Sequence, residues 1–321
     1  MNEEVKTAHS ALIAEIRKLQ KEDGLTLSQI TRESGIAKST VSQFLSGQYG
    51  GNNEKIAEQA QKWLDTYKAR HQLNGKLRTE PEFILLPSSK QWVQLFEYAQ
   101  MAGDIGVITG APGTSKTVTA EYYCKTNSNA WMVTASSSLR SPRALLEEIA
   151  EIVDSPVKSG SGVMRGLIKR LRNTGGLLII DEAQHLSTES LDQLRGLNDQ
   201  AGIGLAWIGN EPLRGRIEGM GQSKSNAQIF SRVGMWKART KPLKTDLEQL
   251  KDAWGVTNPE LDKLLFWIGS REGGLRELSK TLRFAYFIAG SEGRTELQAS
   301  DIEAGWTQRK SSSLPNSLHR H

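Results

Sequence analysis

One stretch of the chain has the residue types and the spacing of a phosphate-binding loop. Gly110-Ala-Pro-Gly-Thr-Ser-Lys-Thr117 follows a short apolar run and precedes a run that favours a helix. In a loop between a strand and a helix, successive backbone N–H groups face the phosphates, the lysine reaches the β- and γ-oxygens, and the next hydroxyl binds Mg²⁺. We therefore predict that Lys116 binds phosphate and that Thr117 is a metal ligand. The predicted nucleotide contacts in this loop are Gly110, Pro112, Gly113, Thr114, Ser115, Lys116, Thr117 and Val118.

Ser115 is the clearest departure from the usual spacing of such a loop, G-x-x-x-x-G-K-[ST], because it stands where glycine is expected. Its Cβ lies where the backbone comes close to the β-phosphate. Serine is small, so we expect the exchange to affect the rate of hydrolysis more than nucleotide binding. The alternative is an ordinary glycine-rich turn that contains a lysine.

A second stretch supplies two carboxylates at the end of an apolar run. Residues 177–180 are Leu-Leu-Ile-Ile, as expected of a parallel strand buried on both faces, and Asp181-Glu182 follow directly. We predict that Asp181 holds Mg²⁺ through its water shell and that Glu182 polarises the water that attacks the γ-phosphate. The alternative is an acidic helix N-terminus, where carboxylates suit the helix dipole.

Three more polar residues follow candidate strands or begin a candidate helix. Asn210 ends the apolar run 202–209, where its amide could hydrogen-bond the attacking water and the γ-phosphate. Arg232 follows Gln228-Ile-Phe-Ser and could reach the γ-phosphate of a neighbouring subunit as an arginine finger. Arg276, in Gly273-Gly-Leu-Arg, begins a helix that could face the nucleotide. A turn asparagine and a surface arginine are the alternatives for Asn210 and Arg232.

The length and composition indicate two globular domains. The chain has 321 residues, of which 37% are hydrophobic and 24% charged, as in ordinary soluble proteins. We predict a first domain over residues 1–75, a second over residues 76–309 and a disordered tail over residues 310–321. The 41 basic and 36 acidic residues give a net charge of +5, which mildly favours a polyanionic partner.

The cysteine content and the hydropathy bear on the compartment. Cys124 is the only cysteine, which excludes a disulfide within the chain and favours a reducing compartment. The N-terminus lacks a basic segment with an apolar core, and no apolar run approaches the roughly 18 residues that span a bilayer. We expect a cytoplasmic protein without a membrane segment.

The first domain has the layout of a helix-turn-helix. In residues 27–47 a short helix, a glycine turn at Gly35 and a second short helix follow closely, and the stretch resembles the DNA-binding unit of phage repressors. Further helices are expected over residues 11–19 and 54–70, with a linker over residues 71–80. A small helical bundle for protein contacts is the alternative. The residues predicted to face DNA are Lys38, Ser39, Thr40 and Gln43.

The second domain contains two basic runs without acidic residues. They cover residues 155–180 and 219–245. Such runs suit the DNA phosphate backbone, although a solvated helix face is the simpler account. We predict DNA contacts at Arg140, Lys158 and Arg165, and expect this domain to supply most of the DNA affinity.

The order and spacing of these motifs resemble those of the AAA+ ATPases. The phosphate loop and Asp181-Glu182 correspond to Walker A and Walker B, Asn210 to sensor 1, Arg232 to the arginine finger and Arg276 to sensor 2. A helix-turn-helix domain joined to such a module resembles, more narrowly, the MuB family of target-selection ATPases of phage Mu-like transposition. The stretches that carry this narrower resemblance are Asn52-Asn-Glu-Lys55, Gln61-Lys-Trp-Leu64, residues 175–183, Gly202-Ile-Gly-Leu205 and Ile229-Phe-Ser-Arg232.

The resemblance implies an α/β AAA+ fold, in which helices flank a parallel sheet and a helical part follows, preceded by the small all-α domain. It implies an ATPase that uses ATP and Mg²⁺, is stimulated by DNA and assembly, and binds double-stranded DNA with little regard to sequence. It further implies a homo-oligomeric filament on DNA, delivery of that DNA to a transposase that it activates, and the host cytoplasm as location if a phage encodes it.

Three rival functions share parts of this pattern. A helicase loader would carry the same ATPase module and bind a replicative helicase. An ATP-gated transcription regulator would use the helix-turn-helix to bind one operator. A DNA-binding protein with an inactive nucleotide pocket would release no phosphate in the presence of DNA.

Overall fold

The computed structural model describes residues 3–76, 79–222 and 231–309, and the chain divides into two compact units, Met1–Thr79 and Glu80–His321. The predicted tail over residues 310–321 lies outside the described residues.

The first unit contains α1 (Glu3–Glu22), α2 (Leu27–Ser34), α3 (Lys38–Ser46) and α4 (Asn53–Lys76). In the α/β part of the second unit, the helices and strands are α5 (Pro87–Ala102), β1 (Ile105–Gly110), α6 (Lys116–Thr126), β2 (Ala130–Thr134), α7 (Pro142–Ile152), α8 (Val163–Leu171), β3 (Leu177–Asp181), α9 (Thr188–Ala201), β4 (Gly204–Gly209), α10 (Glu211–Gln222) and β5 (Val233–Arg239).

Helices α2 and α3 of the first unit are set by local signals. Thr26 and Gln29 form a reciprocal capping box at the start of α2, and Gly35 ends it in the left-handed conformation with φ of 70°. Their apolar residues Ile30 and Val41 are buried in the core of this unit. On α3, Lys38, Ser39 and Gln43 are exposed and Thr40 is half-buried. Their contact with DNA stays a prediction.

Helix α4 is longer than expected. We predicted that it ends at Arg70 and that residues 71–80 form a linker, but the helix continues to Lys76. Residues 71–76 contain no proline, and a single glycine near a helix end costs only about 1 kcal/mol. The helix can therefore continue through Gly75.

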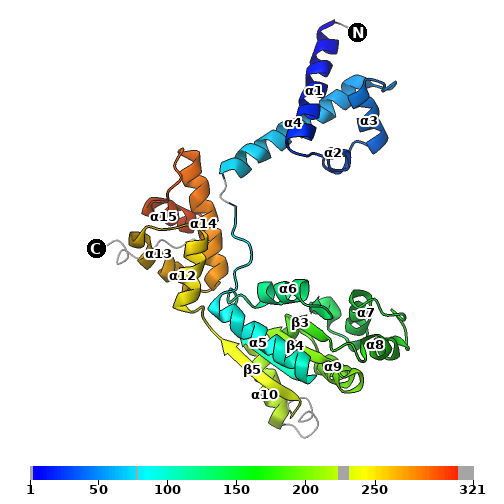
Figure 1. Cartoon of the computed structure of the whole chain (residues 1–321), viewed down its shortest axis with the longest axis vertical. Helices are drawn as coiled ribbons and strands as arrows, with labels where there is room; N and C mark the ends of the chain where they lie inside the picture. Colours follow the sequence, from blue (N-terminus) through cyan, green and yellow to red (C-terminus); the bar gives the residue numbers. More distant parts are fainter. Residues whose placement is uncertain (1–2, 77–78, 223–230, 310–321) are drawn as a thin grey trace. The chain divides into compact units, whose positions relative to one another are not determined.

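The second unit is built on a five-stranded sheet in the order β2-β3-β4-β1-β5, with each neighbouring pair parallel. Strands β3, β4 and β5 are labelled in Figure 1. The two faces of the sheet are covered by different helices. Residues of α5 and α6 pack on one face, and residues of α7, α8, α9 and α10 pack on the other. Strands β1, β3 and β4 are buried along their whole length, which explains their unbroken apolar sequences.

The register of the sheet brings the ends of the central strands together. Thr109 of β1 pairs with Gly209 of β4, and Gly110 pairs with Arg239 of β5. Ile180, one residue before Asp181, pairs with Trp207 of β4. The carboxyl ends of parallel strands all lie at the same end of the sheet. At that end, neighbouring strands are followed by the phosphate loop, Asp181 and Asn210.

A helical part follows the sheet and has its own apolar core. It consists of α12 (Lys244–Ala253), α13 (Asp262–Gly269), α14 (Gly274–Ser291) and α15 (Ala299–Thr307). Trp254, Leu265, Leu282 and Ile302 lie in this core and are fully buried. The predicted parallel sheet with flanking helices and the predicted helical C-terminal part are thus both confirmed. None of the helices within the described residues is long and apolar enough to cross a membrane.

Candidate active site

The loop between β1 and α6 is held closely against neighbouring backbone. A Cβ built on Gly113, whose φ is 79°, would lie 1.8 Å from the carbonyl oxygen of Gly273. A Cβ on Gly110 would lie 2.2 Å from the carbonyl oxygen of Arg239. The N–H of Leu275 at the start of α14 donates to the Gly113 carbonyl at 2.9 Å. These contacts tie the loop to β5 on one side and to the helical part on the other.

We expect Gly113→Ala to lower the free energy of unfolding by about 3 kcal/mol and to remove nucleotide binding, because the new Cβ overlaps backbone. Gly160→Ala is the matched control, since its φ is 83° and nothing lies within 4 Å of the added Cβ. That control isolates the strain of the left-handed conformation, roughly 1 kcal/mol. Urea unfolding and nucleotide titration of both variants provide the measurement. Equal losses in the two would show that the approach to Gly273 is unimportant.

Lys116 is folded onto its own loop. Its Nζ donates to the carbonyl oxygens of Gly110 and Ala111, both at 2.8 Å, and to Thr114 Oγ1 at 3.3 Å. Burial lowers the pKa of Lys116, and the charge of Arg276 adds to that effect, while Asp181 and Glu182 oppose it. The ammonium group therefore sits among backbone oxygens, where a phosphate would offer it a stronger, charged acceptor.

Thr117 and Asp181 are in direct contact. The Thr117 hydroxyl donates to Asp181 Oδ2 at 2.7 Å, and the N–H of Glu182 donates to Asp181 Oδ1 at 2.9 Å. Asp181 is 2% exposed, and this burial raises its pKa although the two hydrogen bonds oppose the rise. A hydroxyl oxygen beside a carboxylate is the kind of donor pair that Mg²⁺ prefers. The two side chains thus fit the predicted metal site.

Glu182 and Asn210 are linked by Gln184, a residue that the sequence analysis missed. Gln184 Nε2 donates to Glu182 Oε2, while its Oε1 accepts from the N–H of Asn210 at 3.4 Å. Glu182 itself has φ of 53°, an unusual value for a residue with a Cβ. The Oδ1 atom of Asn210 is buried and has no hydrogen-bond partner within the described part of the chain. A buried acceptor of this kind needs a donor, such as a bound water.

A cavity of about 950 Å³ collects these side chains. Arg276, near the start of α14, lines the same cavity as the phosphate loop. The predicted residues that line the cavity are Gly110, Pro112, Gly113, Thr114, Ser115, Lys116, Thr117, Val118, Asp181, Glu182, Asn210 and Arg276. Of the residues we predicted around the nucleotide, only Arg232 is absent from this lining.

Part of the cavity lining is apolar, and the sequence analysis did not identify it. Ile84, Leu86, Leu250 and Trp254 line it. The Phe83 and Tyr122 rings stack with centroids 4.2 Å apart and an interplanar angle of 19°. Residues 83–86 stand out in the sequence only as an apolar run before α5. Apolar side chains in the same cavity as a phosphate loop are suited to a nucleotide base.

Arg232 lies at the amino-terminal end of the strands, whereas the phosphate loop follows their carboxyl-terminal end. It directly precedes β5, whose first residue Val233 pairs with Ile105 at the start of β1. The length of β1, roughly 17 Å at 3.3 Å per residue, separates the amino-terminal end from Gly110. The Arg232 side chain is 58% exposed, and its Nε lies 3.4 Å from Asp199 Oδ1. Arg232 therefore cannot reach the phosphate loop of its own chain.

The three residues predicted to contact DNA in the second unit differ in their surroundings. Arg140 and Arg165 are exposed. Lys158 is paired with Glu151 at 2.9 Å and with Asp154 at 3.5 Å. The run that follows Asp154 contains no acid, but folding brings α7 carboxylates to it. Much of the Lys158 charge is thereby balanced within the chain.

The second basic run is also partly used within the protein. Lys237 Nζ donates to the carbonyl oxygen of Gln91 at 2.8 Å, and Arg239 donates to Gln91 Oε1 at 2.6 Å. Both cations thus hold β5 against α5. The alternating burial of a strand places them on the α5 face, which a count of charges along the sequence does not show.

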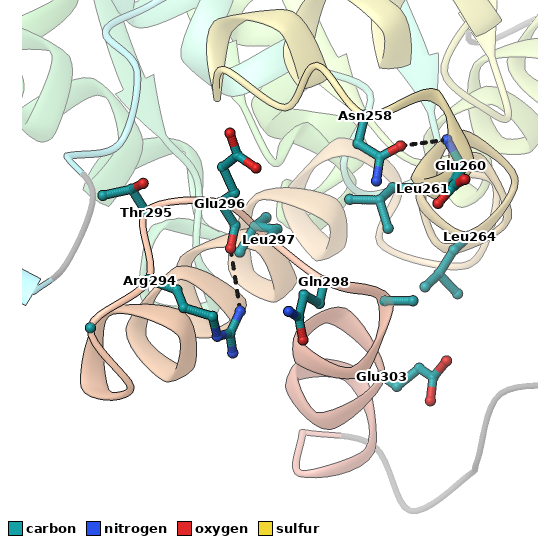
Figure 2. A pocket seen from close by; sticks show the side chains of 12 residues that line it. Asn258, Glu260, Leu261, Leu264, Arg294, Thr295, Glu296, Leu297, Gln298 and Glu303 are labelled. Atoms are coloured by element: carbon teal, nitrogen blue, oxygen red, sulfur yellow. Dashed lines mark hydrogen bonds between the residues drawn. The ribbon is translucent and has the colours of Figure 1, made fainter.

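A second cavity, of about 650 Å³, lies in the helical part and has a different character (Figure 2). Leu261, Leu264 and Leu297 are among its lining residues, together with several glutamates. Its one arginine, Arg294, is bound to Asp301 at 2.7 Å. The lining includes no part of the phosphate loop, so this cavity is separate from the candidate active site.

Comparison with known proteins agrees with this geometry. The AAA domain family matches residues 99–217, and the family described as Mu B transposition protein, C terminal, matches residues 231–308. The chain is 34% identical over 287 residues to the ATP-dependent target DNA activator B of Escherichia phage Mu, which covers 88% of this chain and 90% of that protein. It is also 34% identical over 276 residues to the Mu-like prophage FluMu DNA transposition protein B of Haemophilus influenzae, covering 84% and 94%.

Solved structures support the fold alone. The Aeropyrum pernix ORC2 protein, solved in ADPNP-ADP complexes, aligns with a TM-score of 0.54 and 16% identity, covering 75% of this chain and 72% of that chain. At such low identity the likeness establishes the AAA architecture of the second unit and says nothing of partners.

Proposed function

Because the chain belongs to the MuB family of DNA transposition proteins, we propose that it is an ATPase that binds target DNA in its ATP-bound state and delivers this DNA to a transposase. The observation that carries the proposal is the contact of Thr117 with Asp181 beside the phosphate loop, within a cavity large enough for a nucleotide. The link to ATP and to target DNA comes from the relative in Escherichia phage Mu, an ATP-dependent target DNA activator.

We assign each side chain around the cavity a separate role in ATP hydrolysis. Lys116 would exchange its loop carbonyls for the phosphates, and Thr117 and Asp181 would hold Mg²⁺, which neutralises phosphate charge. Glu182 would accept the proton of the attacking water, and Asn210, with its unpartnered Oδ1, would orient that water. Arg276 would add a positive charge from α14.

The position of Arg232 supports an assembly in which subunits complete each other's sites. This arginine is exposed at the edge of the sheet far from its own loop, so it would act on the nucleotide of a neighbouring copy. Hydrolysis would then depend on assembly along DNA. An open, head-to-tail homo-oligomer along double-stranded DNA provides such neighbours without requiring a closed ring.

Helix α8 offers the basic surface that we propose for the DNA backbone. Arg165, Lys169 and Arg172 line a shallow cavity of about 450 Å³ together with three uncharged residues. Arg165 and Lys169 are exposed and have no carboxylate within ion-pair distance among the side chains that the structure describes. Arg140, also exposed, remains part of the proposal, whereas the balanced charge of Lys158 gives it a smaller share.

We expect Arg165→Ala combined with Lys169→Ala to weaken DNA binding about tenfold at 100 mM salt and to make the slope of log K against log salt shallower by about 1–2, because each neutralised phosphate contributes roughly −0.9. Lys158→Ala is the matched control and should change the slope by less than half as much. Deletion of residues 1–79 should lower affinity but leave ATP-dependent complexes. If the deletion removes DNA binding while the α8 variant is normal, the DNA surface lies in the first unit.

The proposal is tested by a strand-transfer reaction with the cognate transposase. Wild-type protein with ATP should direct insertion into the DNA to which it is bound, and removal of ATP should abolish this effect. Binding of a replicative helicase in place of the transposase would instead support a helicase loader. A single protected operator in footprinting would support a transcription regulator.

A further inference from the structure

Ser115 occupies a conformation that suits glycine. Its φ is 63° and its ψ is 9°, so it lies in the left-handed region directly before α6. Residues with a Cβ are disfavoured there, and glycine is the usual occupant. The backbone nevertheless keeps this conformation, so contacts around Ser115 must compensate for the disfavoured geometry.

The contact that can do so comes from the buried start of α5. Ser89 is fully buried, and its hydroxyl donates to Ser115 Oγ at 3.0 Å. One turn later Trp92, also fully buried, donates its Nε1–H to the carbonyl oxygen of Thr114 at 3.0 Å. The consecutive loop residues Thr114 and Ser115 thus both accept hydrogen bonds from side chains of α5.

The neighbouring serine anchors that helix. The N–H of Ser88 donates to Asp246 Oδ1 at 2.9 Å, and its hydroxyl donates to the other carboxylate oxygen. Asp246 is fully buried at the start of α12. Ser88 therefore binds the helical part while Ser89 binds the loop, and neither hydroxyl is free to replace the other.

The direction of the hydrogen bond between Ser89 and Ser115 decides which of the two hydroxyl protons remains available for a phosphate. A hydroxyl group has one proton and two lone pairs. In this geometry Ser89 uses its proton on Ser115 Oγ, so the proton of Ser115 remains to be donated. Ser115 lines the nucleotide cavity and Ser89 does not. The Ser115 hydroxyl therefore keeps a proton to donate beside the nucleotide cavity, which the glycine of the usual motif lacks.

We propose that Ser89 is a positioning residue for nucleotide binding, which fixes the Ser115 hydroxyl so that it donates to a phosphate oxygen. The pair acts as one unit, in which the hydrogen bond from Ser89 both stabilises the left-handed conformation and leaves the Ser115 proton for the ligand. The inference rests on the proposed ATP binding and deepens it.

A double-mutant cycle tests the pair, with the dissociation constants of ATP and ADP measured by titration of the full-length protein. Ser89→Ala should raise both constants about fivefold in the wild-type background, since it removes one hydrogen bond behind the loop. In the Ser115→Gly background the same change should alter them by less than twofold, because glycine has no hydroxyl to be positioned.

Two further variants separate the possible failures. Ser89→Cys keeps the buried volume but donates only weakly, and it takes the place of Ser89→Ala if that variant does not fold. Lys116→Ala tests ATP binding itself, so undiminished affinity there would overturn the proposed function. The positioning role is overturned if Ser89→Ala has the same effect in both backgrounds, which indicates a general packing role for α5, or has no effect in either.

Discussion

Lys116→Ala is expected to weaken ATP binding by about a hundredfold and to abolish DNA binding with it. The estimate follows from the loss of a charged hydrogen-bond donor to phosphate, worth roughly 1.5–3 kcal/mol. In the structure Lys116 Nζ contacts the carbonyls of Gly110 and Ala111, so its replacement also leaves the loop without an internal partner. Nucleotide titration and filter binding of a DNA duplex, each with and without ATP, measure the two effects.

A matched control and a second variant make this prediction specific. Lys90→Ala removes an exposed lysine from α5 and should leave both activities unchanged. Glu182→Gln should retain ATP and DNA binding while turnover falls by 10²–10⁴-fold, the usual effect of losing a general base. DNA binding by Lys116→Ala at wild-type strength without nucleotide would contradict the coupling between the ATP state and DNA.

Arg232→Ala is expected to lower ATP turnover by about a thousandfold, the lower end of the range for arginine fingers, and to leave ATP binding within twofold of wild type. The reason is that Arg232 lies at the amino-terminal end of the strands, away from its own phosphate loop. From there it can contact only the nucleotide of a neighbouring copy. Arg214→Ala is the control, because Arg214 forms a comparable exposed ion pair, with Glu218 at 2.8 Å. Steady-state phosphate release with DNA present is the measurement.

Mixing two inactive variants tests whether the arginine acts between subunits. Arg232→Ala keeps a complete nucleotide site of its own, while Glu182→Gln keeps the arginine. A mixed assembly places the arginine of the second beside the nucleotide of the first, so phosphate release should reappear. No recovery in mixtures that co-assemble on DNA would show that Arg232 has no role in trans.

The sequence was sufficient to predict which polar residues and which loop lie together around the cavity. Buried parallel strands appear as unbroken apolar runs, so the sequence alone places the polar residues that follow them, such as Asp181 and Asn210, at the carboxyl ends of the strands of one sheet. The glycine-rich loop with Lys116 and Thr117 was likewise predictable, because phosphate binding needs that local order of residues. The cavity brings together all of these residues.

The tertiary structure alone decided which side chains face one another across long stretches of chain. Ser89 and Ser115, for example, are 26 residues apart and share a hydrogen bond. Gln184 contacts both Glu182 and Asn210 because β3 and β4 are neighbours in the sheet. Local patterns specify how each segment folds and which face is buried, but the strand order β2-β3-β4-β1-β5 determines the distances between segments. Arg232 illustrates the difference: its sequence context suggested an arginine finger, and only the parallel pairing of β5 with β1 placed it beyond reach of its own phosphate loop.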